Sequence, residues 1–448
     1  MKIRAGLLFA CALIASGSEA PASDDPRPNF VFILADDVGW SDLHVYGNEA
    51  HLTPSLDDLA RRGLRFTNAY AASPVCSPTR ASILTGKYPA RLRLTNWLGS
   101  VHGVPLAPGL KLKEVTIAEV LRQAGYATGL VGKWHLDGLR NVPKKQGFDT
   151  VVGTPRRSVA LASYYLPNQI PLPRAAEGEY LTDRLTSEAI RFVEANQDRP
   201  FFLFLSYYAV HEPIEGRRDL VAKHEARQHE LGVRLNPAYA AMIEGIDQGV
   251  GRIAVRLDEL GLSERTVVFF FSDNGGFSHR GAEKSGVTSN TPLRMGKGHL
   301  YEGGIRSPLI VRYPARIRPG GVSSVPVVST DFYPTILELA GVEPKSEQSA
   351  DGVSLAPLFA NPATDLGRAA IFFHYPHRNS QGGARSGAIR MGAFKLIEFF
   401  DDEHLELYDL ENDVGESSDL SSAQPETAKR LHRMLISWRD SVNAWMPN

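Results

Sequence analysis

The stretch Asn29–Asp37, NFVFILADD, joins a continuous apolar run to two adjacent carboxylates. Such a run, rich in aromatic and β-branched residues, is typical of a strand that is buried on both faces of a sheet. The arrangement returns at Thr266–Asn274, TVVFFFSDN, and a third apolar run lies at Phe201–Tyr207. Buried strands of this kind predict an α/β fold, in which ligands collect beyond the carboxyl ends of the strands.

Helical patterns separate these strands. Apolar residues recur at helical spacing in the segments 115–123, 181–196 and 237–260. The end of the chain differs, because four short strand-like runs follow one another before a helix near 424–440; the runs are 370–375, 387–391, 394–400 and 405–410. We therefore expect a large, mostly parallel sheet between helices over residues 23–350, and a smaller antiparallel-sheet subdomain over residues 351–448.

The first 22 residues have the layout of a secretory signal peptide. Met1–Arg4 is positively charged, Ala5–Ala15 is apolar, and Ala20–Ala22 gives an A-x-A cleavage pattern. The apolar core is too short to span a bilayer, which takes roughly 20 residues. We therefore expect a secreted or periplasmic protein without a stable membrane span. Removal of the signal would leave Cys76 as the only cysteine, which excludes an intramolecular disulfide.

The charge balance excludes one class of partner. The chain has 49 Lys and Arg residues against 50 Asp and Glu residues, with a formal net charge of −1. Because a nucleic-acid-binding surface requires an excess of positive charge, we expect no nucleic-acid partner.

The remaining cysteine lies in the stretch Ser73–Gly86, SPVCSPTRASILTG. Ser77 is a favourable N-cap and Pro78 a favourable first helical residue, so Cys76 is expected just before a helix N-terminus, where backbone N–H groups favour negative charge. A lone cysteine in such a place is either a small buried hydrophobe or a nucleophile that needs a neighbouring base.

Cys76–Arg80, CSPTR, matches the pattern C-x-P-x-R and resembles the signature of the type I sulfatases. Five further segments resemble the same family in the same order; they are NFVFILADDVGWSDL, GYATGLVGKWHLDG, HEP, FFFSDNGG and GKGHLYEGGIRSPLIVRYP. The resemblance runs from about residue 28 to residue 400, and the chain is identified as a member of this family. It implies an alkaline phosphatase-like fold and a sulfuric ester hydrolase.

The resemblance also implies roles for individual residues. A formylglycine-generating enzyme would oxidise Cys76 to formylglycine (3-oxoalanine), whose hydrated aldehyde is the nucleophile. Arg80 would hydrogen-bond the hydrate, Lys133 would contact the sulfate group, and His135 would accept a proton from the hydrate. On the side of the leaving alcohol, the resemblance places His211 and Lys297.

Oxygen ligands follow two of the predicted strands. Asp36 and Asp37 come after the first, and Asp273 and Asn274 come after the one that begins at Thr266. Side chains that offer only hard oxygen atoms suit calcium or magnesium, and calcium takes six or more such ligands more readily. We therefore expect one divalent cation, Ca²⁺ with Mg²⁺ as the alternative, bound by these four residues and by modified Cys76.

The sequence indicates the substrate much less clearly than it indicates the nucleophile and the cation site. We expect a sulfated small molecule or carbohydrate, and among residues in predicted loops we favour His102 and His374 as substrate-binding residues. Two other functions stay open at this point. One is a phosphonate or phosphate ester hydrolase of the same superfamily, some members of which share C-x-P-x-R, and the other is an inactive sugar-binding homologue.

Overall fold

The computed structural model describes residues 27–98, 109–137, 142–155, 161–232, 235–278, 287–344, 348 and 350–447. Its central element is an eight-stranded sheet. In spatial order the strands are β5 (Thr150–Val152), β4 (Ala127–Gly132), β6 (Phe201–Ser206), β1 (Asn29–Ala35), β7 (Thr266–Ser272), β8 (Leu309–Arg312), β2 (Leu64–Phe66) and β9 (Gly321–Ser323). The first five strands are parallel, and β8 is antiparallel to both of its neighbours. The expected mixed, mostly parallel sheet is therefore confirmed.

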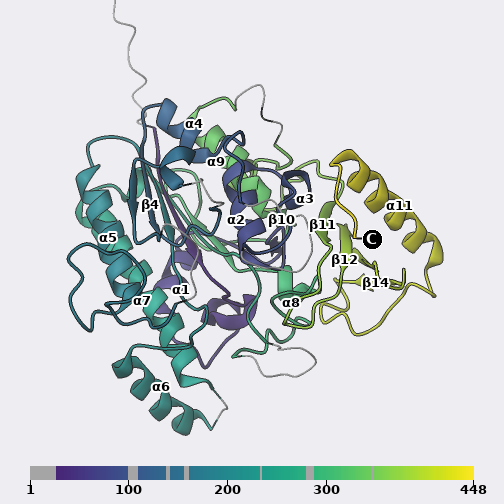
Figure 1. Ribbon diagram of the computed structural model, residues 1–448, viewed down its shortest axis with the longest axis horizontal. Helices are drawn as coiled ribbons and strands as arrows, with labels where there is room; N and C mark the ends of the chain where they lie inside the picture. Colours follow the sequence, from purple (N-terminus) through teal and green to yellow (C-terminus); the bar gives the residue numbers. More distant parts are fainter. Residues whose placement is uncertain are drawn as a thin grey trace, which may run out of the picture.

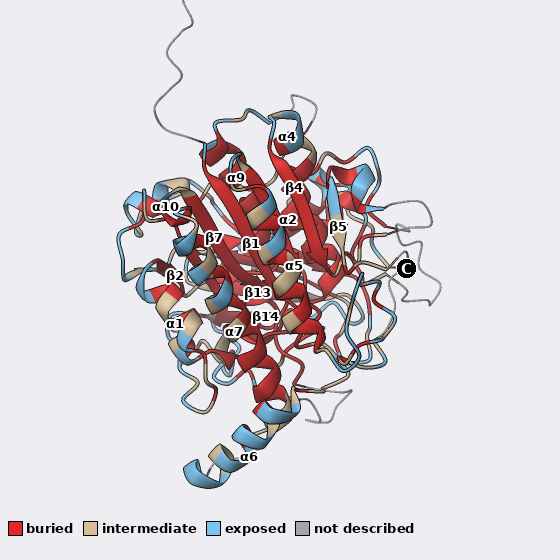
Figure 2. Ribbon diagram, turned by 90° about the vertical axis from the view of Figure 1, so that its left-hand side faces the viewer, coloured by how far each residue is buried: buried red, intermediate tan, exposed pale blue. Residues whose placement is uncertain are grey.

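Helices cover both faces of this sheet (Figure 1). Phe30, Phe32 and Leu34 of β1 point into a core that is closed by α2 (Cys76–Thr85), α4 (Ile117–Gln123) and α9 (Phe332–Ala340). Val31 and Ile33 point into the opposite core, which is closed by α1 (Pro54–Arg61), α5 (Leu181–Ala195) and α7 (Pro237–Glu259). Because successive side chains of a strand alternate between its faces, an entirely apolar strand requires two such cores. Figure 2 shows the sheet buried between its helices.

Shorter elements connect these layers. β3 (Ala69–Tyr70) and β10 (Val327–Val328) form a two-stranded parallel sheet. Helix α6 (Arg218–Leu231) projects from the body and is largely exposed (Figures 1 and 2). The other short helices are η1 (Trp40–Asp42), η2 (His44–Tyr46), α3 (Pro89–Leu92), η3 (Pro143–Gln146), η4 (Ser263–Arg265), α8 (Glu302–Ile305), η5 (Ser329–Asp331) and α10 (Ala356–Ala360).

The C-terminal part is a four-stranded antiparallel sheet with one helix, as expected. Its elements are β11 (Ile371–Tyr375), β12 (Ser386–Met391), β13 (Phe394–Phe399), β14 (Leu405–Asp409) and α11 (Pro425–Ser441). One face packs on α11 through Leu396 and Leu407. The other face packs through Phe373 and Ile397 on residues of the larger unit, including Tyr70. The subdomain is therefore joined to the main sheet by a shared apolar core.

Two boundaries differ from the expected positions. Helix α10, which lies after residue 350, still contributes Leu358 and Phe359 to the core of the large sheet. Helix α2 begins at Cys76 itself, with Val75 as its N-cap, so Ser77 is not the cap. The reason is that the Ser77 hydroxyl accepts a hydrogen bond from the Leu98 N–H at 3.2 Å instead.

Among the described residues, none of the helices combines the length and the apolar character needed to cross a bilayer. The expected signal segment, residues 1–22, lies outside the described residues.

Candidate active site

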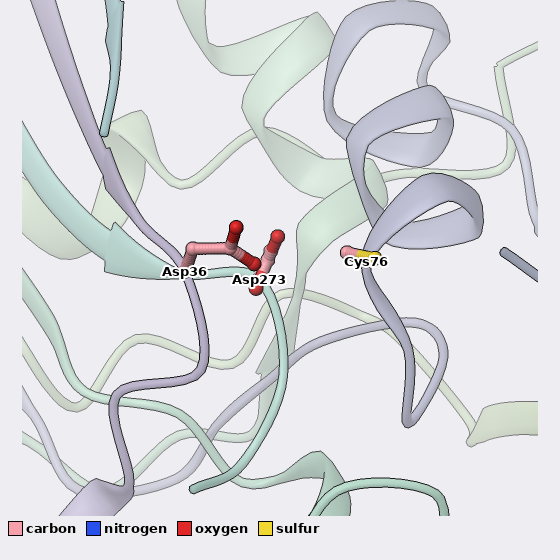
Figure 3. A group of neighbouring side chains, drawn as sticks. All are labelled: Asp36, Cys76 and Asp273. Atoms are coloured by element: carbon pink, nitrogen blue, oxygen red, sulfur yellow. The ribbon is translucent and has the colours of Figure 1, made fainter. Parts of the chain in front are cut away.

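The predicted site residues converge at the carboxyl edge of the main sheet. Asp36 directly follows β1, Asp273 directly follows the adjacent strand β7, and Lys133 directly follows β4. Helix α2 places Cys76 opposite these strand ends. In Figure 3 the carboxylates of Asp36 and Asp273 lie together, with Cys76 at the start of its helix across from them. The ligand atoms of these three buried residues all lie within 4.8 Å of one another.

Cys76 has a base beside it. The Cys76 Sγ atom lies 3.2 Å from His135 Nδ1, and the other ring nitrogen of His135 lies 3.4 Å from the Leu98 carbonyl oxygen. Burial and the nearby Lys133 lower the pKa of His135 to about 3. The imidazole is therefore neutral in the free site and can accept a proton from the side chain at position 76.

Arg80 organises the acidic group from one helical turn beyond Cys76. Its Nε atom donates to Asp273 Oδ2 at 2.8 Å, its Nη2 atom lies 2.6 Å from the same oxygen, and Nη1 donates to the Lys133 carbonyl oxygen and to Ser206. This charged contact holds one oxygen of the Asp273 carboxylate. A hydrogen bond from Arg80 to the hydrate at position 76 stays a prediction.

Each of the other two aspartates has a lysine partner. Lys133 Nζ donates to Asp36 Oδ2, and Lys297 Nζ donates to Asp37 Oδ2 at 2.6 Å. Three carboxylates and three cations therefore balance in the free site. Addition of a divalent cation would leave a net positive charge, which favours an anionic substrate.

His211 approaches from the loop that follows β6. Its Nε2 atom lies 3.9 Å from Asp37 Oδ2, and burial together with Lys297 lowers the pKa of His211 to about 4. Although burial opposes its charge, the carboxylates of Asp37 and Asp36 hold the pKa of Lys297 well above its usual range. In the free site Lys297 therefore carries a proton and His211 does not.

The residues present fit a hard cation. Asp36 Oδ1 and Asn274 Oδ1 are buried and have no hydrogen-bond partner among the described residues. A buried acceptor without a partner costs about 1–3 kcal/mol, so two of them beside the carboxylate of Asp273 indicate a missing cation. Burial and the charge of Asp36 also raise the pKa of Asp273, and a cation would offset that repulsion. The donor atoms are all oxygens, which suits Ca²⁺ or Mg²⁺.

A cavity of about 280 Å³ opens onto this group. Its lining includes the site residues Cys76, Lys133, His135, His211 and Lys297, and we call the part lined by the two lysines the cationic end. The other lining residues are mainly aromatic or apolar, among them Trp97, Leu98, Leu161, Tyr208 and Phe277, together with the polar side chains of Asp137, Thr154, Glu212 and Gln381. The cavity thus combines a cationic end with a mixed apolar and polar wall.

The sequence did not single out most of this wall. Trp97 lies in a loop segment whose residues could be expected to line a pocket, whereas Phe277 and Gln381 lie in loops without any periodic pattern. Tyr208 had a usable signal, because it stands three residues before His211 after a buried strand.

The two residues favoured for substrate binding gain no support. His374 is buried in β11, its Nε2 atom lies 2.8 Å from the Trp445 carbonyl oxygen, and it is not among the described residues that line the cavity. Contact between His374 and substrate therefore stays a prediction that this geometry does not favour. His102 lies outside the described residues.

Two family models match the chain. The model described as Sulfatase matches residues 28–342, and the model described as N-sulphoglucosamine sulphohydrolase, C-terminal, matches residues 295–441. The first covers the main sheet with the charged residues of the site and Cys76, while Gln381 of the cavity wall lies beyond it. The second covers the four-stranded C-terminal sheet and the loop that carries Lys297.

Curated relatives and solved structures agree with these matches. Steryl-sulfatase of Mus musculus is 33% identical over 449 residues, which cover 81% of this chain and 70% of the relative. N-acetylgalactosamine-6-sulfatase of Mus musculus is 35% identical over 376 residues, which cover 78% and 68%. A crystal structure of Ps i-CgsB in complex with k-i-k-neocarrahexaose superposes with a TM-score of 0.79 at 28% identity, covering 92% of this chain and 93% of that one.

Proposed function

This chain belongs to the sulfatase family and hydrolyses sulfate esters, and we propose that it does so with formylglycine made from Cys76, beside one divalent cation, on a sulfated carbohydrate. A single arrangement supports the proposal: Cys76 heads a buried helix, 3.2 Å from a neutral histidine and next to Asp36 and Asp273. A buried thiol has no evident use for oxygen ligands, whereas a hydrated aldehyde presents oxygen to a hard cation.

The cation would be held by Asp36, Asp37, Asp273 and Asn274, together with the modified residue 76. When bound, it would supply positive charge to the nucleophile and to the sulfate oxygens. Calcium is the ion that we expect, because it accepts six or more oxygen ligands more readily than magnesium does.

The chain's own residues divide the remaining work. Lys133 and Lys297 line the same cavity as Cys76, where they would bind the oxygens of the sulfate group and offset the charge that develops there. His135 Nδ1 removes a proton from the side chain at position 76, and Arg80 keeps Asp273 in place. Lys297, which is protonated in the free site, is poised to give a proton to the leaving alcohol, with His211 beside it.

A carbohydrate substrate is proposed from the relatives and structural neighbours of the chain and from the residues that line the cavity. The relatives differ in their substrates, since one is a steryl-sulfatase and another an N-acetylgalactosamine-6-sulfatase. The structural neighbour with the TM-score of 0.79 binds a neocarrahexaose. Aromatic walls such as Trp97 offer apolar faces on which a sugar ring can stack. We also propose that the protein is exported through its N-terminal segment and is matured by a formylglycine-generating enzyme.

The test uses protein produced together with such an enzyme and assayed on p-nitrophenyl sulfate and p-nitrophenyl phosphate. We expect the sulfate to be the preferred ester, chelation to abolish turnover, and Ca²⁺ to restore it. Cys76→Ala should lose activity by a factor on the order of 10³ or more, because the nucleophile is gone. A preference for the phosphate, or turnover by Cys76→Ala at the wild-type rate, would overturn the proposal.

A further inference from the structure

One side chain of the C-terminal subdomain reaches the cavity. The loop between β11 and β12, residues 376–385, carries Gln381 to the cavity wall. Among the described lining residues, Gln381 is the only one that comes from beyond residue 350 and the only carboxamide. Neither the acid–base chemistry nor the cation site uses it.

The loop is tied to the segment that carries Lys297. Asn379 Nδ2 donates to the Gly298 carbonyl oxygen at 2.8 Å, and Asn379 Oδ1 accepts from the Gln381 N–H at 2.9 Å. His299 Nε2 lies 3.0 Å from the Gln381 carbonyl oxygen. The main chain of Gln381 is therefore fixed on both sides, independently of its side chain.

The same segment is tied to the nucleophile. The Gly298 N–H donates to the carbonyl oxygen of Pro74 at 2.9 Å, two residues before Cys76. The two loops approach so closely that a Cβ atom at Gly383 would lie 1.9 Å from the Gly298 carbonyl oxygen. Gln381 is thus held in a defined position relative to both Lys297 and Cys76.

The chemistry of the side chain suggests what it binds. Gln381 Oε1 is buried and has no hydrogen-bond partner among the described residues. A carboxamide offers a donor and an acceptor side by side, which matches a hydroxyl group, itself both donor and acceptor. A second anionic group on the substrate would instead be matched by arginine or lysine. Small-molecule sites fix orientation with a few placed polar groups, and the wall also carries Asp137, Thr154 and Glu212. We single out Gln381 because its Oε1 atom has no hydrogen-bond partner among the described residues.

We propose that Gln381 is a specificity-determining residue that hydrogen-bonds a hydroxyl group of the sugar ring bearing the sulfate ester. The inference rests on the proposed function, because it assumes that the sulfate occupies the cationic end of the cavity. The inference adds that the C-terminal subdomain contacts the sugar ring, while residues at the edge of the main sheet carry out the hydrolysis.

The experiment compares Gln381→Leu with wild type on two kinds of ester. One is p-nitrophenyl sulfate, which has no ring hydroxyl, and the other is a panel of hexose and N-acetylhexosamine monosulfates. The matched control is Ser380→Ala, because Ser380 is exposed on the same loop and does not line the cavity. The variant keeps the backbone contacts of residue 381, so folding is checked by its unchanged thermal unfolding.

Loss of one hydrogen bond to a buried acceptor should lower kcat/KM on the preferred sugar ester at least roughly 10-fold more than on the aryl ester. Equal losses on both esters, equal values in Gln381→Leu and Ser380→Ala, or a wild-type enzyme that cleaves only the aryl ester would each overturn the proposal. Failure of the proposed function would be distinct, because the matured wild type would then cleave neither kind of sulfate ester.

Discussion

At the scale of single residues, the site is built from ion pairs whose two partners come from different segments of the chain. Asp36 is paired with Lys133, and Asp37 with Lys297, although neither pair is close in sequence. The motifs predicted which residues would matter, since each follows a buried strand or lies in a family segment. They did not predict the pairs, because Lys133 and Asp36 follow strands that are separated by β6, and Lys297 lies in a loop.

The loop residues show more clearly what the sequence alone does not predict. Gln381 reaches the cavity only because Asn379 binds the Gly298 carbonyl oxygen, a contact between segments 81 residues apart. No period or local motif encodes such a contact. His374, which the sequence favoured, is instead drawn into the C-terminal subdomain by its hydrogen bond to the Trp445 carbonyl oxygen.

Asp36→Asn tests the cation site with the smallest change of shape. The substitution removes one carboxylate from the ligand set, so we expect the bound metal to fall and kcat/KM on an aryl sulfate to drop roughly 10²–10³-fold. Metal content by inductively coupled plasma mass spectrometry and initial rates would be measured together. Asp58→Asn is the control, because Asp58 pairs with Arg61 on the surface of α1. Full metal content in Asp36→Asn would refute the assignment.

At the scale of elements, the helices and strands follow the apolar patterns closely. The predicted helix over 237–260 is α7, and the predicted strand at Thr266–Ser272 is β7. Helix α2 starts two residues earlier than predicted, at Cys76 instead of Pro78, and Ser77 accepts a hydrogen bond from the Leu98 N–H instead of capping the helix. Local signals therefore predict that an element exists, whereas tertiary contacts decide where it begins.

The N-terminus of α1 is capped by a side chain of α7. Thr53 provides no side-chain cap for α1, and the Ser55 and Leu56 N–H groups donate instead to Asp247 of α7, at 3.2 and 2.8 Å. Burial raises the pKa of Asp247 to about 6, although these N–H groups oppose the rise. The contact links the N-terminus of α1 to the longest helix of the same face.

Substitution of this carboxylate should change both stability and its dependence on pH. Asp247→Ala should lower the free energy of unfolding by about 1–2 kcal/mol, since two N–H groups lose their acceptor. Because the pKa of the Asp247 carboxyl is higher in the folded than in the unfolded state, the native state binds an extra proton. The stability that this proton adds to the native state is lost as pH rises from 4 through 6. The stability of wild type relative to Asp247→Asn should therefore fall by about 2–3 kcal/mol from pH 4 to pH 7. Urea unfolding at several pH values measures this, and a constant difference would contradict the account.

At the scale of the whole molecule, the C-terminal subdomain is joined to the main unit by buried contacts. Lys395 of β13 is fully buried between Glu302 of α8 and Glu416, at 3.0 and 2.8 Å. Glu302 belongs to the larger unit, so this ion group crosses the boundary. The same boundary carries the shared apolar core and the loop with Gln381. The two units are therefore joined by a buried ion group and a shared apolar core, and both contribute residues to the cavity wall.

Lys395→Met should expose that dependence. Removal of the cation leaves buried Glu416 without its cationic partner and Glu302 with Arg306 alone, and we expect the free energy of unfolding to fall by about 3–5 kcal/mol. Lys429→Met is the matched control, because Lys429 pairs with Glu426 on the surface of α11 and should contribute little. Denaturant unfolding of both variants would decide, and equal stability of the two would show that the buried group does not join the units.

The central claim, that an aldehyde made from Cys76 cleaves the sulfate ester, is tested most directly by relating turnover to modification. Preparations matured to different extents would be digested, and the fraction of Cys76 present as aldehyde would be measured by mass spectrometry of its peptide. The account predicts that the initial rate on an aryl sulfate, in the presence of Ca²⁺, rises in proportion to that fraction and extrapolates to zero when all of Cys76 is thiol. Turnover that is independent of the aldehyde fraction would contradict it.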